Sequence, residues 1–213
     1  MGDGHWTCLI APGTLAPMRR PRDNFPGGFF HVGTRGNNRG DVLSDDRMMV
    51  TFMRMFARVA LRYRWLVYAW CLLTTHYHVV VHTPDAGLSE GMRDLNGGYA
   101  RWSNNYRGRA DHAFGKRFGS VLIETDEHLR EACRYVVLNP VRAGICKSPA
   151  DWPWSSYHAT AGLVQPPSFL AVGPLLSMFH RDPAKARAAY RGFIDNGIHS
   201  ERYVPVPPDL PDV

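Results

Sequence analysis

Two extended apolar runs, separated by only three residues, constrain the fold of this chain more than any other feature. They are Trp65 to Leu73 and Tyr77 to Thr83, and Thr74-Thr75-His76 joins them. Apolar runs of this length with so short a connection are typical of an antiparallel β-hairpin. The first run is also the longest apolar run of the chain, at nine residues, whereas a membrane-spanning helix needs about 20. We therefore expect paired strands here and no association with a membrane.

The segments around the hairpin alternate between strand and helix patterns. In chain order we expect a strand over Phe29 to Arg35, a helix over Arg47 to Arg64, the two hairpin strands, a helix over Leu88 to Tyr106, a strand over Gly119 to Glu124, and a third helix that follows Thr125-Asp126-Glu127 and ends near Leu138, before Pro140. The order β-α-β-β-α-β predicts an α+β fold with a ferredoxin-like core, in which a four-stranded antiparallel sheet carries its helices on one face. The third helix is an addition to that core.

Composition divides the chain into three parts. Residues 1–17 have the pattern of neither a signal peptide nor a structural element, so we expect a disordered leader or a natural start at Met18. Residues 18–145 form the predicted domain. Residues 146–213 form a C-terminal appendage, helical over Pro183 to Gly197 and rich in proline from Val204 onward.

Net charge favours a polyanionic partner. Lys and Arg number 25 against 19 Asp and Glu, which gives a net charge of +6 and a pI near 9.3. Such a balance makes nucleic acid the first candidate, although most of the cations are Arg, a bias that GC-rich codon usage alone can produce. The four cysteines stand far apart with no C-x-x-C pair. This spacing argues against a zinc ribbon or a disulfide scaffold and favours reduced thiols in the cytoplasm.

His76 and His78 flank Tyr77 at the start of the second hairpin strand. Because strand side chains alternate, the two imidazoles point to the same face, about 6.6 Å apart along the strand, and both can reach one divalent ion. A structural role for the pair is the competing interpretation. His82 shares this face but lies about 13 Å from His78, too far to share the ion, so we expect it at the surface or facing substrate.

A nucleophile on a neighbouring helix would be a tyrosine. Tyr99 and Tyr106 fall within an apolar stripe of the helix after the hairpin, so we expect both in the core. Tyr135 lies about 120° from the centre of the apolar stripe of the third helix, which leaves its hydroxyl free to face away from the core. Asn139 falls on the same side of that helix. A surface or interface tyrosine is the alternative. The stripe of the third helix consists of Leu129, Ala132, Cys133 and Val136.

Four blocks of the sequence resemble single-tyrosine HUH transposases, and in particular their REP-associated branch. Cys71 to Val81 resembles the HUH motif, in which two histidines surround a hydrophobic residue, and Cys133 to Gly144 resembles the tyrosine-helix signature. The segment Phe25 to Arg39 and the segment Asp151 to Tyr157 are similar to the flanking blocks of the same branch. The resemblance covers about residues 18–200 in order.

The resemblance implies a metal-dependent endonuclease and strand transferase that acts on single-stranded DNA near hairpins or palindromic repeats. Its implied cofactor is Mg²⁺ or Mn²⁺, held by His76 and His78, with Asn139 as the implied third ligand. Tyr135 is the implied nucleophile, forming a 5′-phosphotyrosine intermediate. The alternatives are a domesticated protein that binds DNA hairpins without cutting and, more remotely, a replication or conjugation initiator. A homodimer is compatible with the sequence.

Two basic clusters are candidate DNA contacts. Residues 101–117 interleave aromatic residues with five cations, a mixture that suits a groove for unpaired bases, although a solvated loop around a core helix is an equal alternative. The five cations are Arg101, Arg107, Arg109, Lys116 and Arg117. A second cluster could hold a hairpin stem and consists of Arg19, Arg20, Arg22, Arg35 and Arg39.

The sequence departs from the family pattern in two places. Thr74-Thr75 precedes the first histidine where the family usually has an Asp-Asn or similar pair, and the stretch Ala110 to Phe118 has no glycine before its histidine. We expect both departures to alter DNA contacts and neither to touch the ligand or nucleophile positions.

Overall fold

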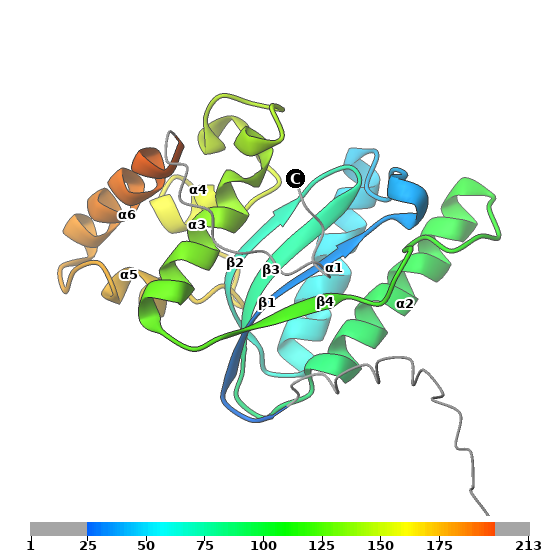
Figure 1. Cartoon of the computed structure of the whole chain (residues 1–213), viewed down its shortest axis with the longest axis horizontal. Coiled ribbons are helices and arrows are strands. Elements are labelled where there is room, and N and C mark those ends of the chain that lie inside the picture. The colour runs from blue at the N-terminus through cyan, green and yellow to red at the C-terminus, as the bar shows by residue number, and fades with distance from the viewer. Residues whose placement is uncertain (1–24, 199–213) are drawn as a thin grey trace, which may run out of the picture.

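The structure is a computed structural model and describes residues 25–198. Its centre is a four-stranded antiparallel sheet in the order β2-β3-β1-β4 (Figure 1). The hairpin is confirmed, because the Leu73 N–H donates to the His76 carbonyl at 2.8 Å across a two-residue turn. This strand order and the intervening helices confirm the predicted ferredoxin-like α+β core. The strands are β1 (Gly28–Arg35), β2 (Leu66–Leu72), β3 (His76–Thr83) and β4 (Gly119–Ile123).

One face of the sheet is covered by α1 (Asp46–Arg62) and α2 (Leu88–Arg107) (Figure 1). The Tyr77 ring of β3 lies at the centre of this core, with its centroid 4.6 Å from that of Phe52, and Phe52 in turn lies 5.1 Å from Tyr99. All three rings are fully buried. Because side chains alternate along a strand, the neighbours of Tyr77 in β3 point to the opposite face.

That opposite face is covered by α3 (Asp126–Arg142), the helix predicted as an addition to the ferredoxin-like core (Figure 1). Thr125 caps it as predicted, accepting a hydrogen bond from the His128 N–H at 3.1 Å. The helix does not stop before Pro140. A proline lacks an N–H but keeps a helical φ, and the turn continues through the Ala143 N–H, which donates to Asn139, and the Ile145 N–H, which donates to Pro140, both at 2.9 Å.

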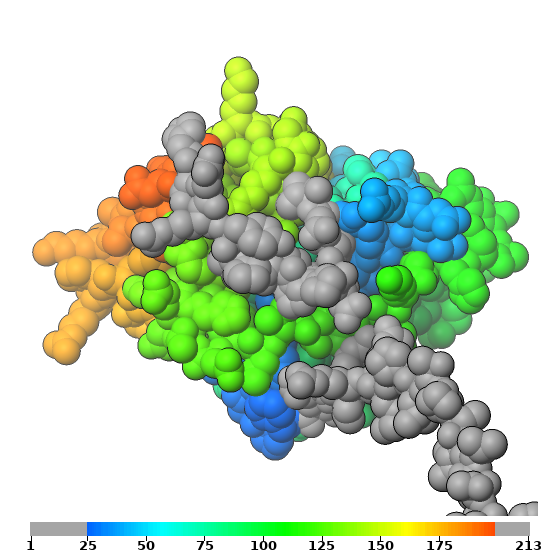
Figure 2. Space-filling model, in the orientation of Figure 1, coloured from blue at the N-terminus to red at the C-terminus, as the bar shows by residue number. Residues whose placement is uncertain are grey.

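The outer side of α3 is covered in turn by α6 (Pro183–Ile198), next to the short helices α4 (Tyr157–Ala161) and α5 (Val172–Ser177). The Arg134 guanidinium lies 4.3 Å from the Phe193 ring centroid at this contact. Every residue from 132 to 140 is consequently buried. Figure 2 shows α6 at the opposite end of the molecule from α2.

The edge of the sheet at β2 is paired with the chain that follows α3. The Leu72 N–H donates to Trp154 at 2.9 Å, and the Ala171 N–H donates to Val67 at 2.7 Å. These contacts satisfy backbone groups that an edge strand would otherwise expose. Two single-turn 3-10 helices complete the described elements, Asn37–Arg39 and Pro149–Asp151.

Several predictions lie outside the described residues. They concern the leader over 1–17, the start at Met18, the cations Arg19, Arg20 and Arg22, and the tail from Val204. The boundary near residue 145 stays a prediction. Among the described helices, none is both long and apolar enough to cross a membrane.

Candidate active site

Three aromatic side chains from three elements meet on the α3 face of the sheet. They are His31 of β1, His78 of β3 and Tyr135 of α3. The ring centroid of Tyr135 lies 5.5 Å from that of His31 and 5.6 Å from that of His78. Nε2 of His31 lies 3.1 Å from Nδ1 of His78, within hydrogen-bond distance. The fold therefore brings the predicted nucleophile next to one of the two predicted ligands.

His76 and Asn139 complete the group. The ring centroids of His76 and His78 are 5.3 Å apart, which confirms that the two imidazoles share one face of β3, and the ring planes are nearly perpendicular. Nε2 of His76 lies 3.4 Å from Oδ1 of Asn139, which α3 carries one turn after Tyr135. All four residues predicted for the catalytic centre are thus brought together.

The hydroxyl of Thr75 lies 2.9 Å from Nδ1 of His76. This contact corrects the expectation that the departures from the family pattern stay clear of the ligand positions. The turn of the hairpin places Thr75 directly before His76, so its hydroxyl can fix the orientation of the imidazole. A partner on Nδ1 directs the other nitrogen, Nε2, toward Asn139.

Burial makes two imidazoles of this site, those of His76 and His31, poor bases. It lowers the pKa of His76 to about 4, and the positive charge of Arg35, its partner in the β1–β3 register, acts in the same direction. Burial also lowers the pKa of His31 to about 3. Both rings are therefore neutral at pH 7, which leaves a lone pair on each imidazole.

These residues fit a divalent cation. Two imidazoles and an amide oxygen can serve as ligands, and the 3.4 Å between His76 and Asn139 is close to the roughly 3 Å that separates adjacent ligands of an octahedral ion. The Asn139 amide nitrogen is buried and finds no hydrogen-bond partner among the described residues. Within residues 25–198 no group of three or more His, Cys, Asp or Glu side chains could hold a metal ion. Among the described residues, a cation here would therefore need the Asn139 amide as well as the two imidazoles.

Tyr135 is not on the free side of α3. Its side chain is buried, with 3% of its surface exposed, which corrects the expectation that it lies outside the core. A single apolar stripe predicts one buried side, but α3 has two buried sides, one against the sheet and one against α6. Tyr135 belongs to the side that faces the sheet and its histidines.

The sequence patterns did not predict two residues of the site, His31 and Arg142. His31 lies on the face of β1 that carries the site, and strand alternation over Phe29 to Arg35 could have indicated it. Arg142 follows Tyr135 by two helical turns, and its guanidinium carbon lies 4.9 Å from the Tyr135 ring centroid. The expected helix end near Leu138 excluded Arg142, although a spacing of seven residues places both on one side of a longer helix.

The candidate DNA-binding residues do not form one group. Arg35 is half-buried at the end of β1, whereas Arg39 and Arg109 are exposed. Arg107 donates to the carbonyl of Asp41 at 2.6 Å and to the hydroxyl of Ser44 at 2.7 Å, so it fixes the segment that leads into α1.

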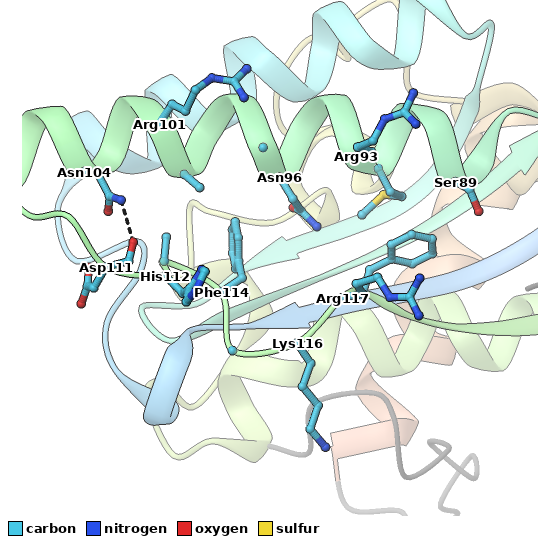
Figure 3. Close-up of a pocket in the computed structure, with 16 residues that line it drawn as sticks. Ser89, Arg93, Asn96, Arg101, Asn104, Asp111, His112, Phe114, Lys116 and Arg117 are labelled. Carbon is cyan, nitrogen blue, oxygen red and sulfur yellow. Dashed lines mark hydrogen bonds between the residues drawn. The ribbon is translucent and has the colours of Figure 1, made fainter. Parts of the chain in front are cut away.

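The other three cations, Arg101, Lys116 and Arg117, line a pocket of about 750 Å³ together with Arg93 (Figure 3). The pocket lies between α2 and the loop before β4. Its loop contacts the end of β1, since the Gly115 N–H donates to the Arg35 carbonyl at 3.2 Å. These three predicted contacts therefore share one surface, on the α2 side of the sheet.

The aromatic residues among these cations are partly paired with one another. The rings of Trp102 and Tyr106 are stacked at 5.1 Å, and the Arg47 guanidinium covers Tyr106 at 4.9 Å. Tyr106 is 41% exposed, so it does not lie in the core as the stripe predicted. The last buried residue of α2 is Ser103, so the buried stripe ends about one turn before the end of the helix. His82, finally, is half-buried and stacks on Phe29 at 4.2 Å.

Comparison with known proteins agrees with this arrangement. The family model described as "Transposase IS200 like" matches residues 28–139, more than half of the chain, and this stretch includes all four strands and Tyr135. The chain belongs to the IS200-like transposase family. The REP-associated tyrosine transposase of Escherichia coli strain K12 is 28% identical over 136 residues, which cover 61% of this chain and 75% of that protein.

A solved structure of a REP-associated tyrosine transposase bound to a REP hairpin has the same fold. It superposes on this IS200-like transposase with a TM-score of 0.59 at 22% identity, over 70% of this chain and 88% of that one. The resemblance predicted from the sequence motifs is therefore confirmed at the level of family and fold.

Proposed function

We propose that this chain cleaves single-stranded DNA near hairpins or palindromic repeats and rejoins it through a 5′-phosphotyrosine intermediate on Tyr135. One observation carries the proposal: α3 holds Tyr135 in ring contact with His78 and, one turn later, holds Asn139 within reach of His76. A tyrosine beside residues that could hold a cation suits nucleophilic attack on a phosphate, because a metal ion can activate such a reaction.

In the proposed reaction, the Tyr135 oxygen bonds to phosphorus as the bond from phosphorus to the 3′ oxygen breaks. The phenol loses a proton and the released strand gains one as its 3′-hydroxyl, so the exchange is neutral overall. A 3′-hydroxyl that attacks the phosphotyrosine reverses these steps and frees Tyr135. The covalent link keeps the phosphodiester available for rejoining.

The residues around Tyr135 support both binding and attack. A divalent cation, Mg²⁺ or Mn²⁺, when bound would polarise the scissile phosphate as a Lewis acid. His76, His78 and Asn139 would hold it. The Arg142 guanidinium lies 4.9 Å from the centroid of the Tyr135 ring and so places a positive charge beside the proposed nucleophile. α3 and the sheet exclude water from the tyrosine ring, which is 3% exposed.

The proposed partner is single-stranded or hairpin DNA. A solved relative of the same fold binds a REP hairpin, and the excess of Arg and Lys in this chain suits a polyanion. Arg35 is the candidate contact nearest to the site, because it pairs with His76 in the β1–β3 register. The exposed cations Arg39, Arg101, Arg109, Lys116 and Arg117 could follow the DNA backbone away from it.

The test is to incubate the protein with end-labelled single-stranded hairpin DNA from the flanks of its own gene and Mn²⁺, and to look for a covalent adduct. Tyr135→Phe should abolish the adduct. Tyr99→Phe is the matched control: it removes a hydroxyl that donates to the Val42 carbonyl at 2.6 Å, so it should cost about 1 kcal/mol of stability and keep the adduct.

Mass spectrometry of the trapped adduct assigns the nucleophile. A nucleotide on Tyr135 supports the proposal, and a nucleotide on any other residue contradicts it. Hairpin binding by the wild-type protein without any adduct would favour the alternative function, a hairpin-binding protein that does not cut.

A further inference from the structure

His31 packs with His78 and Tyr135, but it is neither a proposed metal ligand nor the proposed nucleophile. It is 3% exposed and projects from β1 on the α3 face. The residue directly opposite His78 in the register is Gly33, which has no side chain. His31 lies two residues before Gly33, on the same face of β1. This spacing lets the His31 imidazole reach across the strand pair to His78, at 3.1 Å between Nε2 and Nδ1.

A contact between two imidazole nitrogens links the tautomers of the two rings. A neutral imidazole has one N–H donor and one acceptor nitrogen, so only one ring can donate in this pair. If Nδ1 of His78 carries the hydrogen and donates to His31, then Nε2 of His78 keeps a lone pair for a cation. If His31 donates instead, Nε2 of His78 carries a hydrogen and cannot be a ligand.

We infer that His31 is a positioning residue that accepts the hydrogen bond from Nδ1 of His78 and thereby holds His78 in its metal-binding tautomer. The inference rests on the proposed function of His78. Partners of this kind, on the far nitrogen of a ligating histidine, fix the ring and its tautomer. The same His31 ring packs at 5.5 Å against Tyr135, so it also fixes the distance between that tyrosine and His78.

Two variants of His31 and one of His82 test the inference. His31→Phe keeps a ring of similar size but removes the acceptor, whereas His31→Gln offers an amide oxygen that can accept the same hydrogen bond. His82→Phe is the matched control, because His82 lies on the same face of β3 and stacks on Phe29 instead of on the site. Mn²⁺ affinity is measured by electron paramagnetic resonance, without DNA.

We expect His31→Phe to bind Mn²⁺ 10–100-fold more weakly than the wild type, His31→Gln to recover most of the loss, and His82→Phe to match the wild type. Equal affinity in His31→Phe and the wild type would overturn the inference. Nitrogen-15 NMR of the wild-type imidazoles gives a second measurement that needs no variant to fold: His78 protonated on Nε2 in the metal-free protein would also overturn it.

Failure of the inference can be told apart from failure of the proposed function. If the wild-type protein neither binds Mn²⁺ nor forms the Tyr135 adduct, the proposed function fails and the inference with it. If the wild type does both and His31→Phe does both equally well, the inference alone fails.

Discussion

Neighbouring residues of β3 serve different parts of the molecule. Tyr77 donates a hydrogen bond to Asn96 of α2 at 2.6 Å on one side of the sheet, while His76 and His78 meet α3 on the other. Strand alternation predicted the shared face of the histidines correctly, because this geometry depends on the backbone alone. Their partners His31 and Thr75 were harder to predict, since each contact depends on how strands and turns pair in three dimensions.

The buried histidines should make the fold sensitive to acid. In the unfolded chain a histidine has a pKa near 6.5 and takes up a proton at pH 5, whereas the pKa of His31 is about 3 and that of His76 about 4 in the folded chain. The free energy of unfolding therefore carries no penalty from these two histidines above about pH 6.5. It falls as the pH drops, until about pH 4 for His76 and about pH 3 for His31. Between pH 7 and pH 5 we expect a loss of up to about 2 kcal/mol for each histidine.

Urea unfolding of the protein in EDTA at both pH values measures this loss. His31→Gln removes one of the two groups and should make the dependence on pH shallower. A free energy of unfolding that is the same at pH 7 and pH 5 would contradict the prediction.

At the scale of elements, the two buried sides of α3 decide where Tyr135 lies. The sequence predicted the start of this helix well, because the Thr125 cap is a local signal. It predicted the end and the orientation poorly. Pro140 was expected to stop the helix. The second buried side of α3 lies against α6, which is distant in sequence and whose contact with α3 no local pattern reveals.

The contact between α3 and α6 depends on a glycine. A Cβ on Gly197 would lie 2.6 Å from Cδ of Arg134 and 2.9 Å from a methyl carbon of Leu138, and Arg134 is held in place by Glu131 and Phe193. We expect Gly197→Ala to destabilise the protein by about 1–3 kcal/mol through this overlap.

Gly192→Ala provides the matched control within the same helix. No atom lies within 4 Å of the Cβ it would add, so alanine should stabilise α6 by about 0.5–1 kcal/mol. Thermal melts of both variants test the pair. If the two substitutions shift the melting temperature in the same direction, α6 does not pack on α3 as described.

At the scale of the whole molecule, residues after α3 complete both the sheet edge and the cover of the tyrosine helix. They were predicted to form an appendage, and helix α6 was foreseen from its pattern. Their backbone pairing with β2 was not, because Trp154 and Ala171 carry no strand signal of their own. Long-range pairing of irregular segments leaves no periodic trace in a sequence.

A chain that ends at residue 145 should therefore be unstable. It would expose the backbone groups of β2 and the apolar outer side of α3, and open strand edges promote aggregation. We expect it to be insoluble or to elute as aggregates in size-exclusion chromatography. A chain that ends at Ile198 keeps every contact described for this region and is the control. A monomeric 1–145 chain with an unchanged melting temperature would show that residues 146–198 are dispensable for folding.

Because β3 packs against the α1–α2 core on one face and against α3 on the other, its length is constrained during evolution. Adding or removing one residue inside this strand would exchange its two faces, sending histidines into the α1–α2 core and Tyr77 toward α3. Insertions and deletions there would cost the fold as well as the proposed reaction. Point substitutions at His76, His78 or Tyr135 would cost the proposed reaction but would keep the pairing of the strands. Relatives of this chain that lack the proposed reaction should therefore keep the spacing of β3 while its side chains on the α3 face change.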